Sequence, residues 1–283
     1  MTDLQALIPG VQQICREAAA AILQVYADAE SWNRQDKADA SPVTAADLAA
    51  HAVIRDGLEA LTPGWPQLSE EAADIPWVER QSWTRYWLID PLDGTREFLD
   101  RNDEFTVNIA LIEAGQPLLG VILQPVTGCC WWGGSGLGAW KQEAEQPPQP
   151  LRVQALQPPR LRVLTSQRHG LERMSSLVDA LQHQGLKVEA QPLGSSLKFC
   201  YLAEGRADFY PRLGPTGEWD TAAAQAILEA AGGQLLTWSL EPLRYNQKAS
   251  LINPDFVALA DSTQPWSDWL AAFQPRNTED SLP

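Results

Sequence analysis

Two carboxylates follow a buried-strand pattern in the segment Asp90-Pro91-Leu92-Asp93-Gly94-Thr95. The apolar run Trp87-Leu88-Ile89 before them predicts a strand that ends at this segment. Pro91 fixes its own φ, and Gly94 allows a positive φ and a close approach of the backbone to a ligand. Carboxylates at this spacing can hold hard cations, while the turn amides and the Thr95 hydroxyl can face a phosphate bound to those cations. The segment therefore suggests metal-assisted phosphate chemistry.

An acidic surface turn is the simplest alternative, because Asp and Gly are common in loops. Two other motifs can be tested by their spacing. A calcium-binding loop needs Asp at alternate positions before its glycine, but Pro91 and Leu92 occupy that region. An aspartyl-phosphate phosphatase would need a nucleophilic Asp two residues before Asp93, where Pro91 stands. Both of these motifs are excluded.

Two further carboxylates stand at sequence positions of similar character. Glu70 follows a stretch rich in turn formers, and Asp220 opens an Ala-rich helix that Gly232-Gly233 ends. Taken singly, Glu70 fits a solvated loop, and Asp220 fits a helix cap or a partner of the helix dipole. Together with Asp90 and Asp93 they make four carboxylates, which are enough to hold and bridge two divalent ions.

With these carboxylates in place, the sequence resembles a known family, the lithium-sensitive, magnesium-dependent phosphatases of the inositol monophosphatase superfamily. Three signatures match in order: Ser69-Glu70-Glu71, then Trp87 through Thr95 with Phe98, then Trp219-Asp220-Thr221-Ala222-Ala223. Within the superfamily it is most similar to the CysQ-type 3′(2′),5′-bisphosphate nucleotidases. That closer match rests on 41–47, 104–110, 194–200, 210–212 and 214–216, and the resemblance spans roughly residues 1 to 255.

The resemblance implies a fold and a metal site. The fold would be a layered αβαβα sandwich of α+β or α/β type, with the metal site in the cleft between two halves. Two or more Mg²⁺ ions per active site are implied. Glu70, Asp90 and the Leu92 carbonyl would bind one ion, and Asp90, Asp93 and Asp220 would bind the other.

The resemblance also implies how phosphate and water are held. The amides of Gly94 and Thr95 would contact the phosphate, and Thr95 with Asp47 would orient the attacking water. Glu70, Leu92, Asp93 and Asp220 would thereby also border the substrate. From the residues alone Asp47 has an alternative role, because its spacing from Thr44 fits a capping box that would merely begin a helix.

Substrate choice depends on a second polar cluster. Ser195, Ser196 and Lys198 near a helix start could bind a second phosphate through amides, hydroxyls and charge. A plain helix cap with a solvated lysine is the alternative. Arg212 is a further candidate, and no role is assigned to Glu218.

Three functions follow from these observations. The resemblance favours hydrolysis of adenosine 3′,5′-bisphosphate to AMP and phosphate, which clears a by-product of sulfate assimilation. It leaves open hydrolysis of the sulfated analogue, 3′-phosphoadenosine 5′-phosphosulfate. The second function is an inositol- or sugar-phosphate phosphatase, and the third is a catalytically dead binding protein. The third is disfavoured because every expected metal ligand is present.

Composition restricts the partners. Asp and Glu exceed Lys and Arg by 36 − 21 = 15, and the pI is about 4.6. Such a surface repels nucleic-acid polymers and anionic membranes, but a small phosphorylated nucleotide can still bind where cations dominate the local field. The apolar stretch 18–25 is too short to span a bilayer. Monomer and dimer are equally compatible with the sequence.

The four cysteines do not form the pattern of a disulfide framework, so we expect buried free thiols and a cytoplasmic protein. The resemblance leaves open a peripheral position at the cytoplasmic face of the inner membrane, although the acidic chain offers no visible anchor. No serine or cysteine nucleophile with a histidine partner is indicated, which favours direct attack by water.

Composition and periodicity divide the chain into an N-terminal α+β domain (1–145), a Pro/Gln-rich linker (146–160), a C-terminal α/β domain (161–276) and a tail (277–283) that we expect to be disordered. In the first domain we expect helices over 4–26 and from Thr44, strands near 86–90, 105–113 and 118–125, and a hairpin over 131–140. In the second domain we expect strands near 161–165, 186–191 and 206–211, and helices near 171–184, 196–203, after Asp220 and at Trp266.

Overall fold

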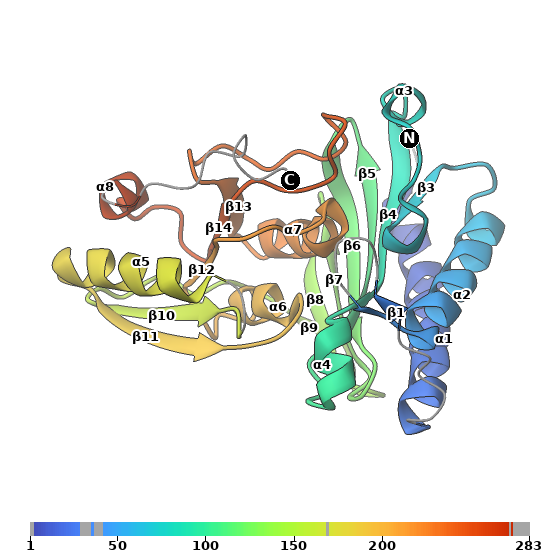
Figure 1. The fold of residues 1–283 in the computed structure, drawn as a ribbon, viewed down its shortest axis with the longest axis horizontal. Helices are drawn as coiled ribbons and strands as arrows, with labels where there is room; N and C mark the ends of the chain where they lie inside the picture. Colours follow the sequence, from blue (N-terminus) through green and yellow to red (C-terminus); the bar gives the residue numbers. More distant parts are fainter. Residues whose placement is uncertain (1–2, 29–34, 37–41, 168–169, 272, 274–283) are drawn as a thin grey trace.

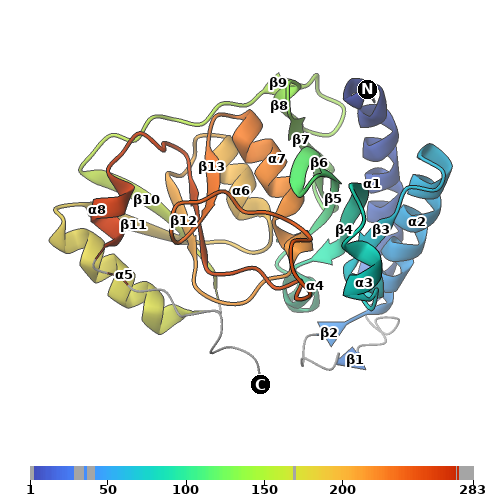
Figure 2. The same ribbon diagram turned by 90° about the horizontal axis from the view of Figure 1, so that it is seen from above.

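Five alternating layers of helices and sheets make up the protein (Figure 1). The computed structural model describes residues 3–28, 35–36, 42–167, 170–271 and 273; the predicted tail 277–283 lies outside this range. In order, the layers are α1 and α2, a seven-stranded sheet, α6 and α7, a five-stranded sheet, and α5 with α8 (Figures 1 and 2). The predicted αβαβα sandwich is confirmed.

The first layer is a pair of helices whose starts are capped by Asp and Thr side chains. Helix α1 (Leu4–Ala27) begins at Asp3, whose Oδ1 accepts from the amides of Gln5 and Ala6. Helix α2 (Ala45–Leu61) begins with a capping box formed by Thr44 and Asp47, as the spacing predicts. Both helices pack their apolar faces on one side of the larger sheet.

The larger sheet has the strand order β3-β4-β5-β6-β7-β8-β9, and β3 and β4 pair in parallel. The β7–β8 pair confirms the predicted hairpin, and β9 lies inside the predicted linker, where it pairs with β8. The strands are β3 (Gln67–Ser69), β4 (Arg85–Asp93), β5 (Thr106–Glu113), β6 (Gln116–Gln124), β7 (Cys129–Gly134), β8 (Gly138–Gln142) and β9 (Gln149–Pro150). Around them lie β1 (Gln35–Asp36), β2 (Pro42–Val43), η2 (Glu70–Ala72), α3 (Trp77–Arg80) and α4 (Thr95–Asp100).

The smaller sheet is mixed, with the order β11-β10-β12-β14-β13. Strand β10 is parallel to β11 and β12, whereas β14 is antiparallel to β12 and β13. The strands are β10 (Arg160–Thr165), β11 (Lys187–Pro192), β12 (Phe209–Arg212), β13 (Gln234–Thr237) and β14 (Phe256–Leu259). Helices α5 (Leu171–His183) and α8 (Trp266–Leu270) pack against its outer face. The sequence did not predict β13 and β14, whose four-residue length is too short for a clear alternation.

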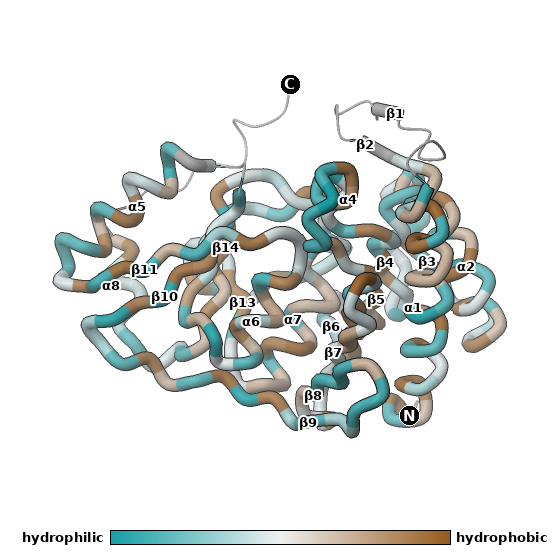
Figure 3. Tube along the Cα trace, turned by 90° about the horizontal axis from the view of Figure 1, so that it is seen from below, coloured by the Kyte–Doolittle hydropathy of each residue, from teal (hydrophilic) through white to brown (hydrophobic). Residues whose placement is uncertain are grey.

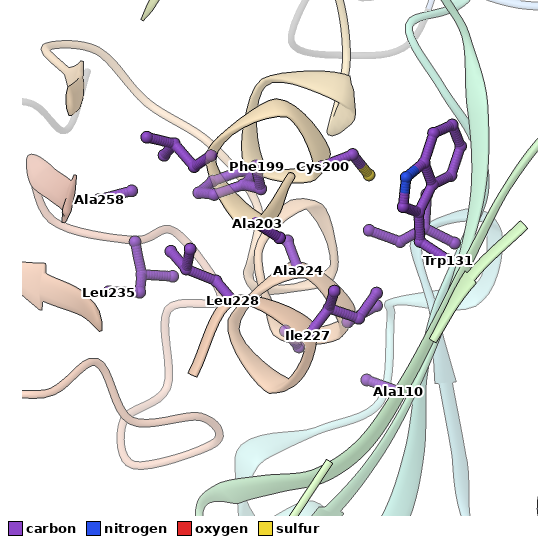
Figure 4. Close-up of a cluster of buried hydrophobic side chains, with 14 of the residues drawn as sticks. Ala110, Trp131, Phe199, Cys200, Ala203, Ala224, Ile227, Leu228, Leu235 and Ala258 are labelled. Atoms are coloured by element: carbon purple, nitrogen blue, oxygen red, sulfur yellow. The ribbon is translucent and has the colours of Figure 1, made fainter. Parts of the chain in front are cut away.

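Helices α6 (Leu197–Ala203) and α7 (Ala222–Ala230) fill the space between the two sheets. Their apolar side chains meet the inner faces of both sheets, and Figure 4 shows Ile227 and Leu228 of α7 between Trp131 on one side and Leu235 on the other. In Figure 3 the hydrophobic colours accordingly gather in the strands and the central helices, whereas α4 is mostly hydrophilic. The short helix η3 (Glu218–Asp220) leads directly into α7.

Gly120 of β6 sets the distance between α7 and the larger sheet. A Cβ atom at this position would lie 2.1 Å from the carbonyl oxygen of Ala223, so helix and strand meet backbone to backbone. Because Asp220 lies just before α7, this contact also determines how close Asp220 comes to the residues at the end of β4.

We predict that Gly120→Ala lowers the free energy of unfolding by about 1–3 kcal/mol or more, because two backbones must separate to admit the methyl group. Chemical denaturation followed by circular dichroism measures the change. Gly10→Ala is the matched control: its new methyl group meets only the end of the Leu61 side chain, and removing a helix-interior glycine gains up to about 1 kcal/mol. Equal effects of the two substitutions would contradict the close contact.

Candidate metal and phosphate site

Three of the four predicted acidic ligands meet at one point. Glu70, Asp90 and Asp220 each place a carboxylate oxygen within 4.8 Å of the other two. They come from η2 after β3, from the end of β4 and from η3 before α7. Burial, together with repulsion from Glu70 and from Asp93, raises the pKa of Asp90 and of Asp220 well above the usual value. A bound divalent cation would compensate this buried charge, so the oxygen donor set fits such an ion.

The end of β4 carries a bulge that shapes the site. Asp90 lies opposite Asn108 of β5 and Asp93 lies opposite Thr106, so that Pro91 and Leu92 are accommodated against a single residue of β5. The amide of Leu92 donates to Asp90 Oδ1 at 3.0 Å. The bulge thus orients the first carboxylate and lets the chain turn immediately after the second.

Gly94 makes this turn with a φ of 95°. A Cβ atom here would lie 3.1 Å from the carbonyl oxygen of Glu104 and 3.3 Å from Cβ of Ser195. Glycine is therefore required both by the backbone conformation and by the neighbouring loop. The turn places Thr95 at the start of α4, beside the acidic residues.

Asp93 does not belong to the three-carboxylate cluster. Its Oδ2 lies 3.4 Å from Nδ2 of Asn108, which donates to it. Burial raises the pKa of Asp93 to about 6, and the nearby Lys198 charge and the backbone amide of Ser196 partly offset this rise. Asp93 thus stands between the acidic cluster and the second half of the protein.

Asp47 divides its carboxylate between two tasks. Oδ2 accepts from the amide and the hydroxyl of Thr44, at 2.8 and 2.6 Å, which completes the helix cap. Oδ1 accepts from the hydroxyl of Thr95 at 3.1 Å. The capping role and the contact with Thr95 therefore coexist, and burial raises the pKa of Asp47 to about 6.

A cleft of about 190 Å³ opens between the two halves of the protein, above the acidic cluster. It brings together nine of the predicted residues: Glu70, Asp93, Gly94, Thr95, Ser195, Ser196, Lys198, Arg212 and Asp220. Asp47, Asp90 and Leu92 are buried and do not line it. Residues that the sequence did not predict complete the lining, among them Arg96, Glu97, Gln167, Tyr210 and Phe256.

Ser196 and Lys198 are engaged within the protein. The Ser196 hydroxyl lies 2.9 Å from Asn108 Oδ1 and 2.8 Å from Thr106 Oγ1. Lys198 Nζ donates to the carbonyls of Leu193 and Ser195, at 3.1 and 2.6 Å, and burial lowers the pKa of Lys198 to about 8. The alternative of a solvated lysine is therefore wrong, since Lys198 is only 5% exposed.

Two arginines add positive charge to the cleft. Arg212 uses Nε and Nη2 to bind the carbonyls of Gly214 and Pro215. Arg96 is exposed in the first turn of α4, and no hydrogen bond or ion pair joins it to another described residue. Its position directly after Thr95 was the signal in the sequence that could have identified it.

Asp220 is supported by residues that lie far away in the chain. Its Oδ2 accepts from the Gly217 amide at 2.9 Å, and the neighbouring Glu218 is buried and accepts from the Asn246 amide at 2.8 Å. Asn246 in turn exchanges hydrogen bonds with Arg80, which also donates to the carbonyls of Lys248 and Ala249. No local pattern predicts this support, because Arg80 and Asn246 are 166 residues apart.

Comparison with known proteins gives consistent results. The sequence profile of the inositol monophosphatase family matches residues 3–271. The chain is 48% identical over 252 residues to the 3′(2′),5′-bisphosphate nucleotidase CysQ of Escherichia coli (strain K12), which covers 88% of this chain and 98% of that protein.

Two relatives of known structure extend the comparison. A CysQ from Bacteroides thetaiotaomicron superimposes with a TM-score of 0.80 at 35% identity, covering 91% of this chain and 98% of that one. An inositol monophosphatase from Anabaena superimposes with a TM-score of 0.74 at 25% identity, covering 97% and 98%.

We predict that Arg80→Met lowers the free energy of unfolding by about 1–3 kcal/mol, because the buried Asn246 side chain loses its donor and the partly buried carbonyls of Lys248 and Ala249 lose theirs. Urea denaturation measures the change. Arg55→Met is the control, since Arg55 is exposed and pairs only with its neighbour Asp56, a contact that contributes about 1 kcal/mol or less. A loss for Arg80→Met no larger than for Arg55→Met would show that the buried network does not support this region.

Proposed function

Because the chain belongs to the inositol monophosphatase family, we propose that it is a 3′(2′),5′-bisphosphate nucleotidase, a phosphoric monoester hydrolase. Its substrate is adenosine 3′,5′-bisphosphate, and its products are AMP and phosphate. The reaction removes a by-product of sulfate assimilation, and the proposal extends to 3′-phosphoadenosine 5′-phosphosulfate as a second substrate.

The observation that carries the proposal is the distribution of charge in the cleft. Glu70 and Asp220 line it next to the buried Asp90, while Arg96, Lys198 and Arg212 line it as well. A substrate with two phosphates can place one at the acidic cluster, through bound cations, and the other near these basic groups. An inositol or sugar monophosphate, the alternative substrate, brings hydroxyls in place of the second phosphate.

The proposed cofactor is Mg²⁺, with two or more ions per site. Glu70, Asp90 and Asp220 would hold it, with Asp93 and the Leu92 carbonyl as further donors. When bound, a pair of such cations lowers the pKa of a coordinated water and neutralises developing charge on the reacting oxygens.

The chain's own residues have three proposed tasks. The amides of Gly94 and Thr95 bind phosphate oxygens at the turn after β4. The Thr95 hydroxyl donates to Asp47 Oδ1, so its oxygen lone pairs are free to accept a hydrogen from the attacking water. Asp47 can then receive a proton through Thr95, provided that its carboxylate is ionised.

We propose a cytoplasmic location, supported by the four cysteines, which are all buried free thiols as the sequence predicts. The peripheral position at the inner membrane gains no support from the described residues. Within them, no helix has the length and apolar character needed to cross a bilayer.

The test of the function is a comparison of kcat/KM for adenosine 3′,5′-bisphosphate, adenosine 3′-monophosphate and inositol 1-phosphate with the wild-type enzyme and Mg²⁺. We expect the bisphosphate to be the best substrate. Preference for inositol 1-phosphate would replace the proposal by its alternative, and no turnover of any of the three would refute both.

We predict that Arg96→Ala lowers kcat/KM for the bisphosphate about 10- to 100-fold, because a charge-assisted contact contributes about 1.5–3 kcal/mol. Hydrolysis of adenosine 3′-monophosphate should change much less, since it lacks the second phosphate. Arg96 is a sharper probe than Lys198, whose removal would also release the carbonyls of Leu193 and Ser195. Arg55→Ala is the control, because Arg55 is exposed and does not line the cleft, so this variant should leave kcat/KM for both nucleotides unchanged.

We predict that Thr95→Val lowers kcat about 10²–10⁴-fold while Thr95→Ser retains most of the activity, because only the hydroxyl can transfer the proton. The pKa of Asp47 of about 6 adds a pH dependence: the ionised acceptor is lost as pH falls, so kcat/KM should decline below about pH 6. The initial rate of phosphate release, measured from pH 5 to 9, reports both effects. Equal activity of the Val and Ser variants would exclude this role of Thr95.

A further inference from the structure

A buried polar chain connects Asp93 to the second half of the protein. Thr106 and Asn108 lie two residues apart on β5, directly opposite Asp93 and Asp90. Ser196 approaches them from the loop before α6. Thr106, Asn108 and Ser196 are at most 1% exposed, and Ser196 also lines the cleft.

The hydrogen bonds of this chain run in one direction. Asn108 Nδ2 donates to Asp93 Oδ2 over 3.4 Å, and its Oδ1 accepts from the Ser196 hydroxyl over 2.9 Å. Since the Ser196 hydroxyl has a single hydrogen, its 2.8 Å contact with Thr106 requires Thr106 to donate. The order Thr106, Ser196, Asn108, Asp93 therefore ends on a carboxylate, which polarises the whole chain.

Ser196 also belongs to the loop that holds the proposed site of the second phosphate. The Ser195 carbonyl accepts from Lys198, and the Gly194 amide donates to Glu104 at 2.6 Å. Ser195 itself has a φ of 45°, an uncommon conformation for a residue with a side chain. The position of this segment, which joins the loop to the first two residues of α6 and is called the loop 193–198 below, is thus linked to the position of the Asp93 carboxylate.

We propose that the chain Thr106–Ser196–Asn108 couples cation binding at Asp93 to the ordering of the loop 193–198. A divalent cation coordinated by Asp93 holds the carboxylate in place, and the hydrogen-bonded chain transmits this constraint to Ser196. By linkage, the ordered loop raises the affinity for the cation by the same factor by which the bound cation favours the ordered loop. The role of this loop in binding the second phosphate of the substrate rests on the proposed function. The coupling between the loop and the cation involves only Mg²⁺ and the protein.

The first test is the affinity for Mg²⁺ without substrate, measured by calorimetry. Outer partners of metal ligands typically contribute about 10- to 100-fold in affinity, and the Ser196 hydroxyl reaches Asp93 only through Asn108, so Ser196→Ala should weaken Mg²⁺ binding by about tenfold, the lower end of this range. Ser176→Ala is the control, because this exposed serine hydroxyl on α5 donates to the Glu172 carbonyl, outside both the polar chain and the loop 193–198, and its removal should leave the affinity within about twofold. Equal effects of the two substitutions would overturn the proposal.

The second test follows the loop directly. Amide hydrogen exchange of the segment 193–198 should slow when Mg²⁺ is added to the wild-type protein, and this response should disappear in Ser196→Ala. If Ser196→Ala fails to fold, Thr106→Val decides, because it keeps the shape of the side chain and removes the donor. Thr106→Ser, which keeps the hydroxyl, should restore the response.

The coupling would be overturned if the amide exchange rate of the loop 193–198 in the wild type did not change on addition of Mg²⁺. A response to Mg²⁺ in Thr106→Val equal to that of the wild type would overturn it as well. Neither result depends on the substrate. A nucleotidase without coupling and a coupled protein with another substrate can therefore be told apart.

Discussion

The architecture depends on holding three like charges close together, one of them fully buried and the other two only partly exposed. Asp90 is 1% exposed, and one of its oxygens shares a space of 4.8 Å with oxygens of Glu70 and Asp220. Unpaired burial of such charges is among the most costly arrangements in a protein interior. The fold must therefore supply rigidity from elsewhere, and it does so by placing each carboxylate at the end of a different, well-packed element.

Two constructions supply this rigidity. On one side, the ladder between β4 and β5 fixes Asp90 and Asp93 through a bulge rather than through a flexible loop. On the other, Gly120 lets α7 rest directly on the sheet, while Glu218, held through Asn246, secures the turn that carries Asp220. The proposed cation affinity would therefore depend on the packing between the two halves as much as on the carboxylates themselves.

Much of the fold and the centre of the candidate site could be predicted from the sequence. Periodicity revealed the long elements, such as α1 and β5, because one face of each is apolar over many residues. The segment around Asp90 was recognisable because its turn chemistry is local. The Arg80–Asn246 network and the chain through Asn108 were not, since their partners are distant in sequence and polar residues inside strands carry no periodic signal. Lys198 was predicted at the correct place, but its burial was not, because only tertiary packing decides whether a lysine reaches water.

The divided carboxylate of Asp47 has a consequence for how the protein can change. One oxygen begins a helix and the other serves the proposed chemistry, so selection for a more stable fold and selection for faster turnover act on the same side chain. Replacing Asp47 by a neutral capping residue would remove a buried charge and could raise the free energy of unfolding, yet it would also remove the carboxylate that accepts from Thr95. Thermostable descendants of this enzyme would therefore have to gain their stability at positions such as the exposed surface of α1 or α5, and leave the start of α2 unaltered.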